Sequence, residues 1–175
     1  MGNHVEGLLS LSRCMQNPLS ITTVDLSEMA TDIANSLADD YPKREVQIQI
    51  AAGLFVQGDS DLLQTAMEHL IGNAWKFTSK TKGAKITVAQ LSQNGQTCYT
   101  ISDNGVGFDM SHKDMLFRPF YSLHSPGEYE DSGVGLALVK RIIARHGGEI
   151  WAKGEVGRGA TIYFTLAGQQ GKNSY

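Results

Sequence analysis

The run EHLIGNAWKFT at residues 68–78 limits what this chain can fold into more than any other stretch. Its apolar residues continue a helical pattern that begins at Leu62. On that helix His69, Asn73 and Lys76 fall at i, i+4 and i+7, so an imidazole, an amide and an ammonium share one stripe. Asn has a poor helix propensity, so the stripe is either a solvated face or a site. An amide oxygen suits a hard cation and Lys suits phosphate, which together favour magnesium shared with phosphate groups.

Three glycine-containing segments accompany this helix. The first, Asp103-Asn104-Gly105-Val106-Gly107-Phe108, follows a strand-like run. The second, at residues 132–136, opens a helix-like run, and the third, at residues 157–161, precedes a strand. One glycine cluster alone is usually a turn. Four pieces in this order within about ninety residues are more typical of a ligand-binding site.

In these four segments the sequence resembles the ATP-binding catalytic domain of sensor histidine kinases, in the superfamily shared with gyrase and heat-shock chaperone ATPases. Phytochrome-like and PAS-linked kinases show a similar Asn-Ala-Trp-Lys-Phe-Thr run. The resemblance extends from about Val24 to Leu166. It implies an α+β fold, a two-layer α/β sandwich of the Bergerat type. Strands that cluster as hairpins independently favour a mixed sheet covered by helices on one face.

The resemblance implies a role for each matching residue in binding ATP and Mg²⁺. Asp103 would accept a hydrogen bond from the adenine amine, with Thr161 supporting a water network beneath the base. Asn73 would bridge the magnesium ion and Lys76 would contact phosphate, which makes these two the catalytic residues. The full expected binding set is His69, Asn73, Lys76, Asp103, Gly105, Gly107, Phe120, Gly133, Val134, Gly135, Leu136 and Thr161. Without a ligand, Asp103 would be an Asx-Gly turn residue and Thr161 an ordinary strand residue.

Three positions depart from the family pattern. His69 stands where sensor kinases commonly have Asn and where gyrase-like enzymes have a catalytic Glu. Glu68 is one residue away, which turns its side chain by about 100° and does not support that role. His69 could reach phosphate or a metal-bound water, or simply fill space. Ser122 replaces a frequent basic residue, and Asp131 replaces the first glycine of the second glycine segment.

These departures change which residues are expected to contact phosphate and which could compete with it. Arg118 and His124 are possible replacements for the basic residue that is missing at Ser122. The helix that begins near Gly133 should offer backbone N–H groups and a positive dipole end to the polyphosphate. Asp131 could occupy that helix end itself, which would weaken phosphate binding.

Periodicity and turn residues predict the other elements. Ser27 is the expected N-cap of an early helix, Gly58 is expected to end a strand, and Asp59 or Ser60 is expected to cap the central helix. Gly95 is expected to form a hairpin turn. The expected strands are 24–26, 46–50, 54–56, 84–91, 97–102, 149–152 and 160–166, and a helix is expected at 135–145. The segment 109–131 has little pattern and is expected to form a lid anchored by Phe117 and Phe120.

Composition narrows the function classes. The chain has 175 residues and a net charge of −3, without a basic patch, so nucleic acid is not an expected partner. Cys14 and Cys98 lack metal-ligand spacing and are expected to be reduced thiols. No signal peptide or spanning segment is evident, so a cytoplasmic location without membrane insertion is expected.

The expected domain organisation is a dimerisation-helix tail at 1–22, the ATP-binding domain at 23–168 and a disordered tail at 169–175. His4 is followed by Val5 and does not match a phosphoacceptor motif, which belongs further upstream.

The expected function is therefore that of the catalytic domain of a two-component sensor histidine kinase. Such a domain binds Mg-ATP and transfers the γ-phosphoryl group to a His on dimerisation helices outside this chain, with a response-regulator receiver domain as the further partner. One alternative is a degenerate nucleotide-binding or scaffold module without phosphotransfer. Another is a stand-alone kinase of the anti-sigma-factor type, which the helical remnant at residues 8–15 argues against.

Overall fold

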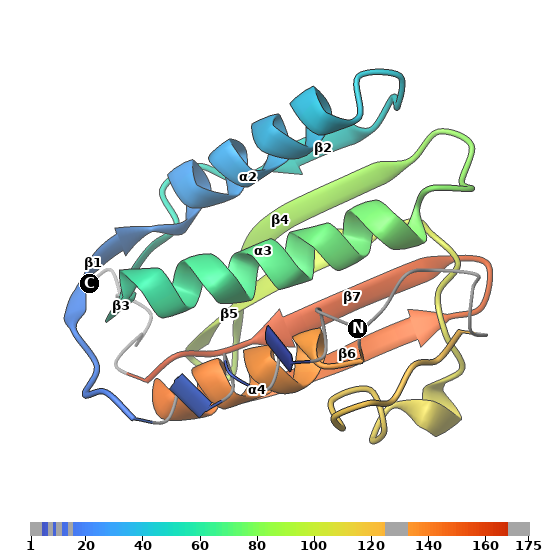
Figure 1. Ribbon diagram of the computed structural model, residues 1–175. Coiled ribbons are helices and arrows are strands. Elements are labelled where there is room, and N and C mark those ends of the chain that lie inside the picture. The colour runs from blue at the N-terminus through green and yellow to red at the C-terminus, as the bar shows by residue number, and fades with distance from the viewer. Residues whose placement is uncertain (1–4, 7–8, 10–11, 14–15, 125–132, 168–175) are drawn as a thin grey trace.

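The computed structural model describes residues 5–6, 9, 12–13, 16–124 and 133–167. Five strands form a mixed sheet in the order β2-β4-β5-β7-β6, in which β2 and β4 run parallel and the other pairs run antiparallel. Helices α2, α3 and α4 lie side by side on one face of this sheet (Figure 1). The expected α+β sandwich, with a mixed sheet covered on one face, is confirmed.

The elements follow one another closely along the chain. In order they are β1 (Ile21–Asp25), α2 (Leu26–Asp40), β2 (Gln47–Ile50), β3 (Phe55–Asp59), α3 (Ser60–Phe77), β4 (Lys85–Gln93), β5 (Gln96–Asp103), the 3-10 helix η1 (Met110–His112), α4 (Gly135–Arg145), β6 (Ile150–Glu155) and β7 (Gly159–Phe164). Strands β1 and β3 pair antiparallel in a separate small sheet.

The core forms between α3 and the sheet. Helix α3 buries an apolar stripe with helical spacing that includes Leu63, Met67, Leu70 and Ala74. This stripe joins one cluster with buried residues from all three helices and from the sheet, among them Ile86. Burying a side chain such as Leu contributes about 1.5–3 kcal/mol, so packing on both sides fixes the position of α3.

The caps of two helices are aspartates. Asp59 caps α3 as expected, and its carboxylate accepts a hydrogen bond from the N–H of Leu62 at 3.1 Å. The expectation that Ser27 caps α2 is wrong, because the carboxylate of Asp25 accepts from the N–H groups of Ser27 and Glu28. The Ser27 hydroxyl instead donates to the carbonyl of Ala51 at 2.6 Å. It therefore ties α2 to the loop between β2 and β3.

Gly58 does not end its strand, contrary to expectation. Strand β3 continues through Gly58, which pairs with Thr22 of β1. A Cβ at this position would lie 2.5 Å from Cδ1 of Leu63 and 3.1 Å from Cδ2 of His146. The glycine is thus explained by close packing against α3 and α4 rather than by a chain break.

Other boundaries shift by a few residues. The β4–β5 hairpin turns at Asn94 and Gly95, both with positive φ, so its turn is shorter than expected. Strand β1 begins at Ile21, two residues before the expected domain start. The expected helical residues Leu8, Leu11 and Met15, the residue Asp131 and the tail 169–175 lie outside the described residues. Within the described part of the chain, no helix has both the length and the apolar character needed to cross a membrane.

His146 joins the end of α4 to the start of α3. It is only 7% exposed, its Nε2 accepts a hydrogen bond from the N–H of Asp59 at 2.9 Å, and its Nδ1 lies 2.7 Å from the carbonyl oxygen of Ile142. These partners require the neutral ring with its proton on Nδ1. The imidazole therefore connects two helices that both contribute to the pocket described below.

We expect His146→Ala to lower the free energy of unfolding by roughly 1–3 kcal/mol, because the substitution removes a buried side chain and leaves the N–H of Asp59 without its acceptor. Urea denaturation measures this difference. His112→Ala, which removes an exposed imidazole, serves as the control. Equal stability of the His146 variant and the parent would contradict this role.

Candidate nucleotide-binding site

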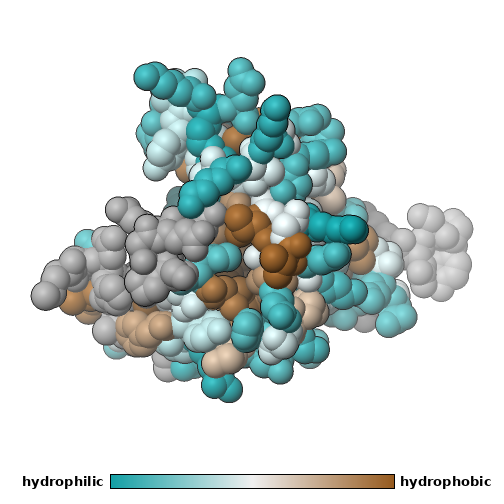
Figure 2. All heavy atoms as spheres, turned by 90° about the vertical axis from the view of Figure 1, so that its right-hand side faces the viewer, coloured by the Kyte–Doolittle hydropathy of each residue, from teal (hydrophilic) through white to brown (hydrophobic). Residues whose placement is uncertain are grey.

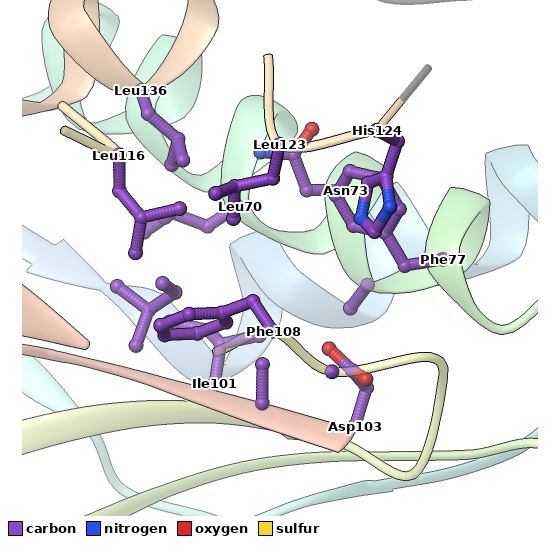
Figure 3. A pocket seen from close by; sticks show the side chains of 14 residues that line it. Leu70, Asn73, Phe77, Ile101, Asp103, Phe108, Leu116, Leu123, His124 and Leu136 are labelled. Atoms are coloured by element: carbon purple, nitrogen blue, oxygen red, sulfur yellow. The ribbon is translucent and has the colours of Figure 1, made fainter. Parts of the chain in front are cut away.

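A largely apolar pocket lies between α3 and the ends of β5 and β7 (Figure 3). Its volume is about 510 Å³, part of which is open to solvent. Figure 2 looks at the side of the molecule where α3 and β5 end, and hydrophobic atoms gather near the middle of that face. The lining residues are Leu70, Asn73, Ala74, Phe77, Ile101, Asp103, Gly107, Phe108, Leu116, Leu123, His124, Leu136, Ala160 and Ile162.

Asp103 provides a carboxylate in these apolar surroundings. It is the last residue of β5, and its side chain points into the pocket (Figure 3). Burial raises the pKa of Asp103 to about 6, although the N–H of Gly105, at 2.9 Å from Oδ1, and the backbone of Ala160 act in the opposite direction. Such a group can accept a hydrogen bond from a planar apolar ligand that carries an amine.

Gly105 and Gly107 shape the loop after β5. A Cβ on Gly105 would collide with the carbonyl of Phe77 at the end of α3, and a Cβ on Gly107 would collide with the carbonyl of Glu155 on β6. Gly107 also has a φ of +64° and lines the pocket, whereas Gly105 is buried beside it. Both glycines therefore let the loop pack against the protein itself, which holds Asp103 in place.

The polar stripe of α3 divides between the pocket and its border. Asn73 lines the pocket (Figure 3). His69 lies one turn earlier, and its Nδ1 would be 2.9 Å from a Cβ built on Gly135 at the start of α4. Lys76 lies beyond the pocket wall, with its Nζ 4.8 Å from the ring centroid of Phe77. The stripe thus runs from the start of α4 past the pocket.

The second glycine segment leads into the N-terminus of α4. Val134 is the N-cap residue, and among the residues that the structure describes no side chain caps this helix, whereas α2 and α3 are capped by aspartates. Gly133 has a φ of +68°, and its carbonyl accepts a hydrogen bond from the N–H of Phe120 at 2.8 Å. Leu136 lines the pocket, while Gly135 lies against His69. A helix N-terminus beside a pocket is suited to an anion.

Thr161 also lies outside the pocket. The Thr161 hydroxyl lies 2.6 Å from that of Ser102, its register partner on β5. Side chains alternate between sheet faces, so Thr161 faces away from Ala160 and Ile162, which line the pocket. Thr161 therefore does not line the pocket, and Ala160, opposite Asp103, lines it instead.

Phe120 likewise does not line the pocket. Its side chain is 56% exposed, and its backbone adopts a φ of +63°. Phe117, the other expected anchor of the lid, is half-buried against a small cluster that contains Phe108, Leu116 and Ala152. The two aromatic residues therefore differ in what they contact: Phe117 packs against this cluster, whereas the backbone N–H of Phe120 donates to Gly133 in the second glycine segment.

Several lining residues were missing from the expected site. Leu116, Leu123 and His124 come from the segment between β5 and α4, and the ring centroid of His124 lies 4.8 Å from that of Phe77. Phe77 belongs to the run at residues 68–78, and Phe108 belongs to the first glycine-containing segment. Their positions near Asn73 and Gly107 in the sequence could therefore have identified them as lining residues. Of the three residues from the connecting segment, His124 was expected only as a possible phosphate contact, and Leu116 and Leu123 have no periodic pattern that could have identified them.

A magnesium ion fits this site only if the phosphate groups of a bound ligand also coordinate it. The described residues contain no group of three or more His, Cys, Asp or Glu side chains that could hold a metal. Asn73 offers one amide oxygen at the pocket wall. Magnesium commonly combines one or two protein oxygens with phosphate oxygens and water, so Asn73 fits the ion when a polyphosphate is bound with it.

Comparisons with known proteins agree with this geometry. Residues 58–170 match the family model described as histidine kinase-, DNA gyrase B-, and HSP90-like ATPase. Cyanobacterial phytochrome B of Nostoc sp. is 34% identical over 169 residues, which cover 95% of this chain and 22% of that protein. The crystal structure of full-length ShkA in complex with AMPPNP matches with a TM-score of 0.76 and 25% identity, over 94% of this chain and 35% of that one.

A further solved structure shares the fold. It is histidine kinase ThkA in complex with the response regulator protein TrrA, with a TM-score of 0.72 and 19% identity over 94% of this chain and 46% of that one.

The chain belongs to the histidine kinase-, DNA gyrase B-, and HSP90-like ATPase family. Within that family it is a catalytic domain of the histidine kinase type, an ATP-binding class of two-component signalling. It spans about a fifth of the length of the first curated relatives that it matches, at 22%, 22% and 19%.

The pKa of Asp103 predicts a specific pH dependence of stability. Because this pKa is about 6 and lies above its ordinary value, protonated Asp103 contributes stability that is present at low pH and lost as the pH rises through about 6. Relative to Asp103→Asn, we expect the free energy of unfolding of the parent to fall by at most ~3 kcal/mol between pH 4 and pH 7. Urea denaturation across this range measures the difference, and a constant difference would contradict the burial of an ionisable carboxyl.

Proposed function

We propose that this chain binds Mg-ATP and acts as the catalytic domain of a sensor histidine kinase, which delivers the γ-phosphoryl group to a His on dimerisation helices outside this chain. One observation supports it above the others. A half-buried carboxylate lies in an apolar pocket that borders the start of α4, where the residues that the structure describes contribute no side-chain cap. That combination separates a base-binding end from a phosphate-binding end.

Adenine recognition rests on Asp103. The exocyclic amine donates a hydrogen bond to the Asp103 carboxylate, and the apolar walls cover the faces of the ring. Ala160, the register partner of Asp103, supplies no hydroxyl, so Asp103 carries most of the polar recognition. A purine with a carbonyl oxygen at the same position would place an acceptor against a carboxylate and would be rejected.

Phosphate recognition rests on α4 and on the polar stripe of α3. The N–H groups at the start of α4 and the positive end of its dipole hold the polyphosphate. Asn73 supplies the oxygen for magnesium, and Lys76 and His69 lie along the same stripe. When bound, Mg²⁺ neutralises phosphate charge, while this chain positions the γ-phosphoryl group for transfer.

The acceptor and the downstream partner must come from outside the chain. The proposal assigns the acceptor histidine to the dimerisation helices of a parent protein, and it assigns the receiver domain of a response regulator as the next partner. The ThkA structure named above pairs a histidine kinase of the same fold with a response regulator.

The test combines binding with transfer. Calorimetric titration with ATP in Mg²⁺ measures binding, and radiolabelled ATP measures transfer to a separately expressed phosphoacceptor helix pair. Binding with transfer supports the proposal. Binding without transfer to any tested helix pair would favour the alternative of a scaffold that couples nucleotide binding to signalling, and absence of ATP binding would overturn both.

We expect Asp103→Asn to weaken ATP binding about ten- to a hundredfold, because an amide nitrogen then faces the adenine amine or the pocket loses a full acceptor. Asp39→Asn is the control, since Asp39 is an exposed carboxylate on α2, outside the pocket. Calorimetry at a pH well above the pKa of Asp103 measures both variants. Unchanged affinity of Asp103→Asn would exclude Asp103 as the adenine contact.

We expect Asn73→Ala to abolish the magnesium dependence of ATP binding, since the amide oxygen is the ligand that joins the ion to the protein. The parent should bind ATP more weakly in EDTA than in Mg²⁺, whereas the variant should bind equally in both. Asn35→Ala, which changes an exposed Asn on α2, is the control. If the parent binds ATP equally well in EDTA, the magnesium role is wrong.

A further inference from the structure

One edge of strand β6 has no strand partner among the residues that the structure describes. Strand β6 is the last strand of the sheet and pairs with β7 along its other edge. The N–H of Gly154 points away from β7, because it lies 3.3 Å from Sδ of Met110. Backbone directions alternate along a strand, so the N–H and C=O groups of Ile150 and Ala152 point to the same free side. Glu149, directly before β6, has the opposite direction: its carbonyl accepts a hydrogen bond from the N–H of Thr165, directly after β7.

A groove runs along this edge. Two hollows of about 720 and 730 Å³, part of which is open to solvent, share Lys140, Ile150 and Trp151, so they form one continuous depression. Helix α4 borders it with Lys140 and Ala144, and the segment around η1 borders it with Phe117. Figure 1 shows β6 as the outermost strand with η1 beside it. The contact between Met110 and Gly154 closes one end.

The half of the groove near η1 is positively charged. Lys113, Lys140 and Lys153 line it together with one carboxylate, Asp114. None of these lysines forms an ion pair with another residue among those the structure describes. At the other end, the carboxylate of Glu149 lies in the hollow that also contains Lys140. The free backbone groups of Ala152 thus lie where ammonium groups predominate.

We propose that this groove binds an extended acidic segment of a partner protein, which adds to β6 as a further strand. Backbone groups of the partner pair with Ile150 and Ala152, and its carboxylates face Lys113 and Lys140. Two outward residues correspond to about four or five partner residues at ~3.3 Å each. The site is separate from the nucleotide pocket and does not depend on the proposed function.

The competing explanation is that the lysines protect the edge. Natural sheets often place Lys on an exposed edge strand to prevent pairing with other chains. A protective edge would bind no extended peptide, whatever its charge. A second copy of this chain could also pair along β6, and it would then protect the same backbone groups without any peptide.

The probe is a fluorescein-labelled seven-residue peptide of alternating glutamate and valine, followed by fluorescence anisotropy. We expect it to bind at least tenfold more tightly than a peptide of alternating lysine and valine. Its version with methylated backbone nitrogens on one edge should bind at least tenfold more weakly, because those nitrogens cannot donate to β6. Equal binding of the acidic and basic peptides, or no binding, would overturn the proposal.

Hydrogen exchange locates the bound peptide. The amides of Ile150 and Ala152 should exchange at least tenfold more slowly with saturating peptide. Those of Trp151 and Lys153 face β7 and provide the internal control. Peptide binding without slower exchange at Ile150 and Ala152 would exclude strand addition. Slower exchange there at high protein concentration without peptide would assign the edge to a second copy and overturn the acidic partner.

Charge reversal tests the acidic preference. The double variant Lys113→Glu with Lys140→Glu should weaken binding of the glutamate–valine peptide at least tenfold. Lys82→Glu reverses an exposed lysine in the loop before β4, outside the groove, and should leave binding unchanged. Circular dichroism verifies that each variant is folded. Unchanged affinity of the folded double variant would remove the charge argument and with it the proposal.

Discussion

Helix α3 packs one face onto the sheet and turns an adjacent polar stripe toward the pocket, so the position of this helix determines the geometry of the site. Its first end is held by the Asp59 cap and by the hydrogen bond that joins Asp59 to His146. At the other end the Arg44 guanidinium donates to the carbonyl of Trp75 and to the hydroxyl of Thr78, and it lies 4.5 Å from the Trp75 ring centroid. A cation at a helix C-terminus is favourable by about 0.3–1 kcal/mol, so both ends of α3 are stabilised electrostatically.

The pocket depends on this fixed helix through backbone contacts. The loop after β5 donates a hydrogen bond from Val106 to the carbonyl of Phe77, and the missing Cβ of Gly105 permits the approach. The carboxylate of Asp103 is therefore buried by protein packing before any ligand binds, which is why its pKa rises. Desolvation of this kind costs stability when the carboxyl ionises, and a ligand that donates a hydrogen bond can recover part of that cost.

The sequence predicted those features that depend on local pattern. Periodicity identified α4, and cap chemistry identified Asp59. Register was not predictable in the same way. A shift by one residue moves a strand side chain to the other face, so the motif alone could not decide between Ala160 and Thr161. The role of Gly58 was predicted incorrectly because it depends on tertiary packing. Gly58 approaches Leu63 of α3 and His146, which is distant in the sequence.

The connecting segment between β5 and α4 borders both the nucleotide pocket and the groove beside β6. Leu116 lines the nucleotide pocket, and the next residue, Phe117, lines the groove beside β6. Helix α4 also serves both, since Leu136 faces the pocket and Lys140, one turn later, faces the groove. A ligand that moves either element changes the other surface. If a nucleotide alters the affinity of the groove for its partner, the partner must alter nucleotide affinity by the same factor, because coupling free energy is reciprocal.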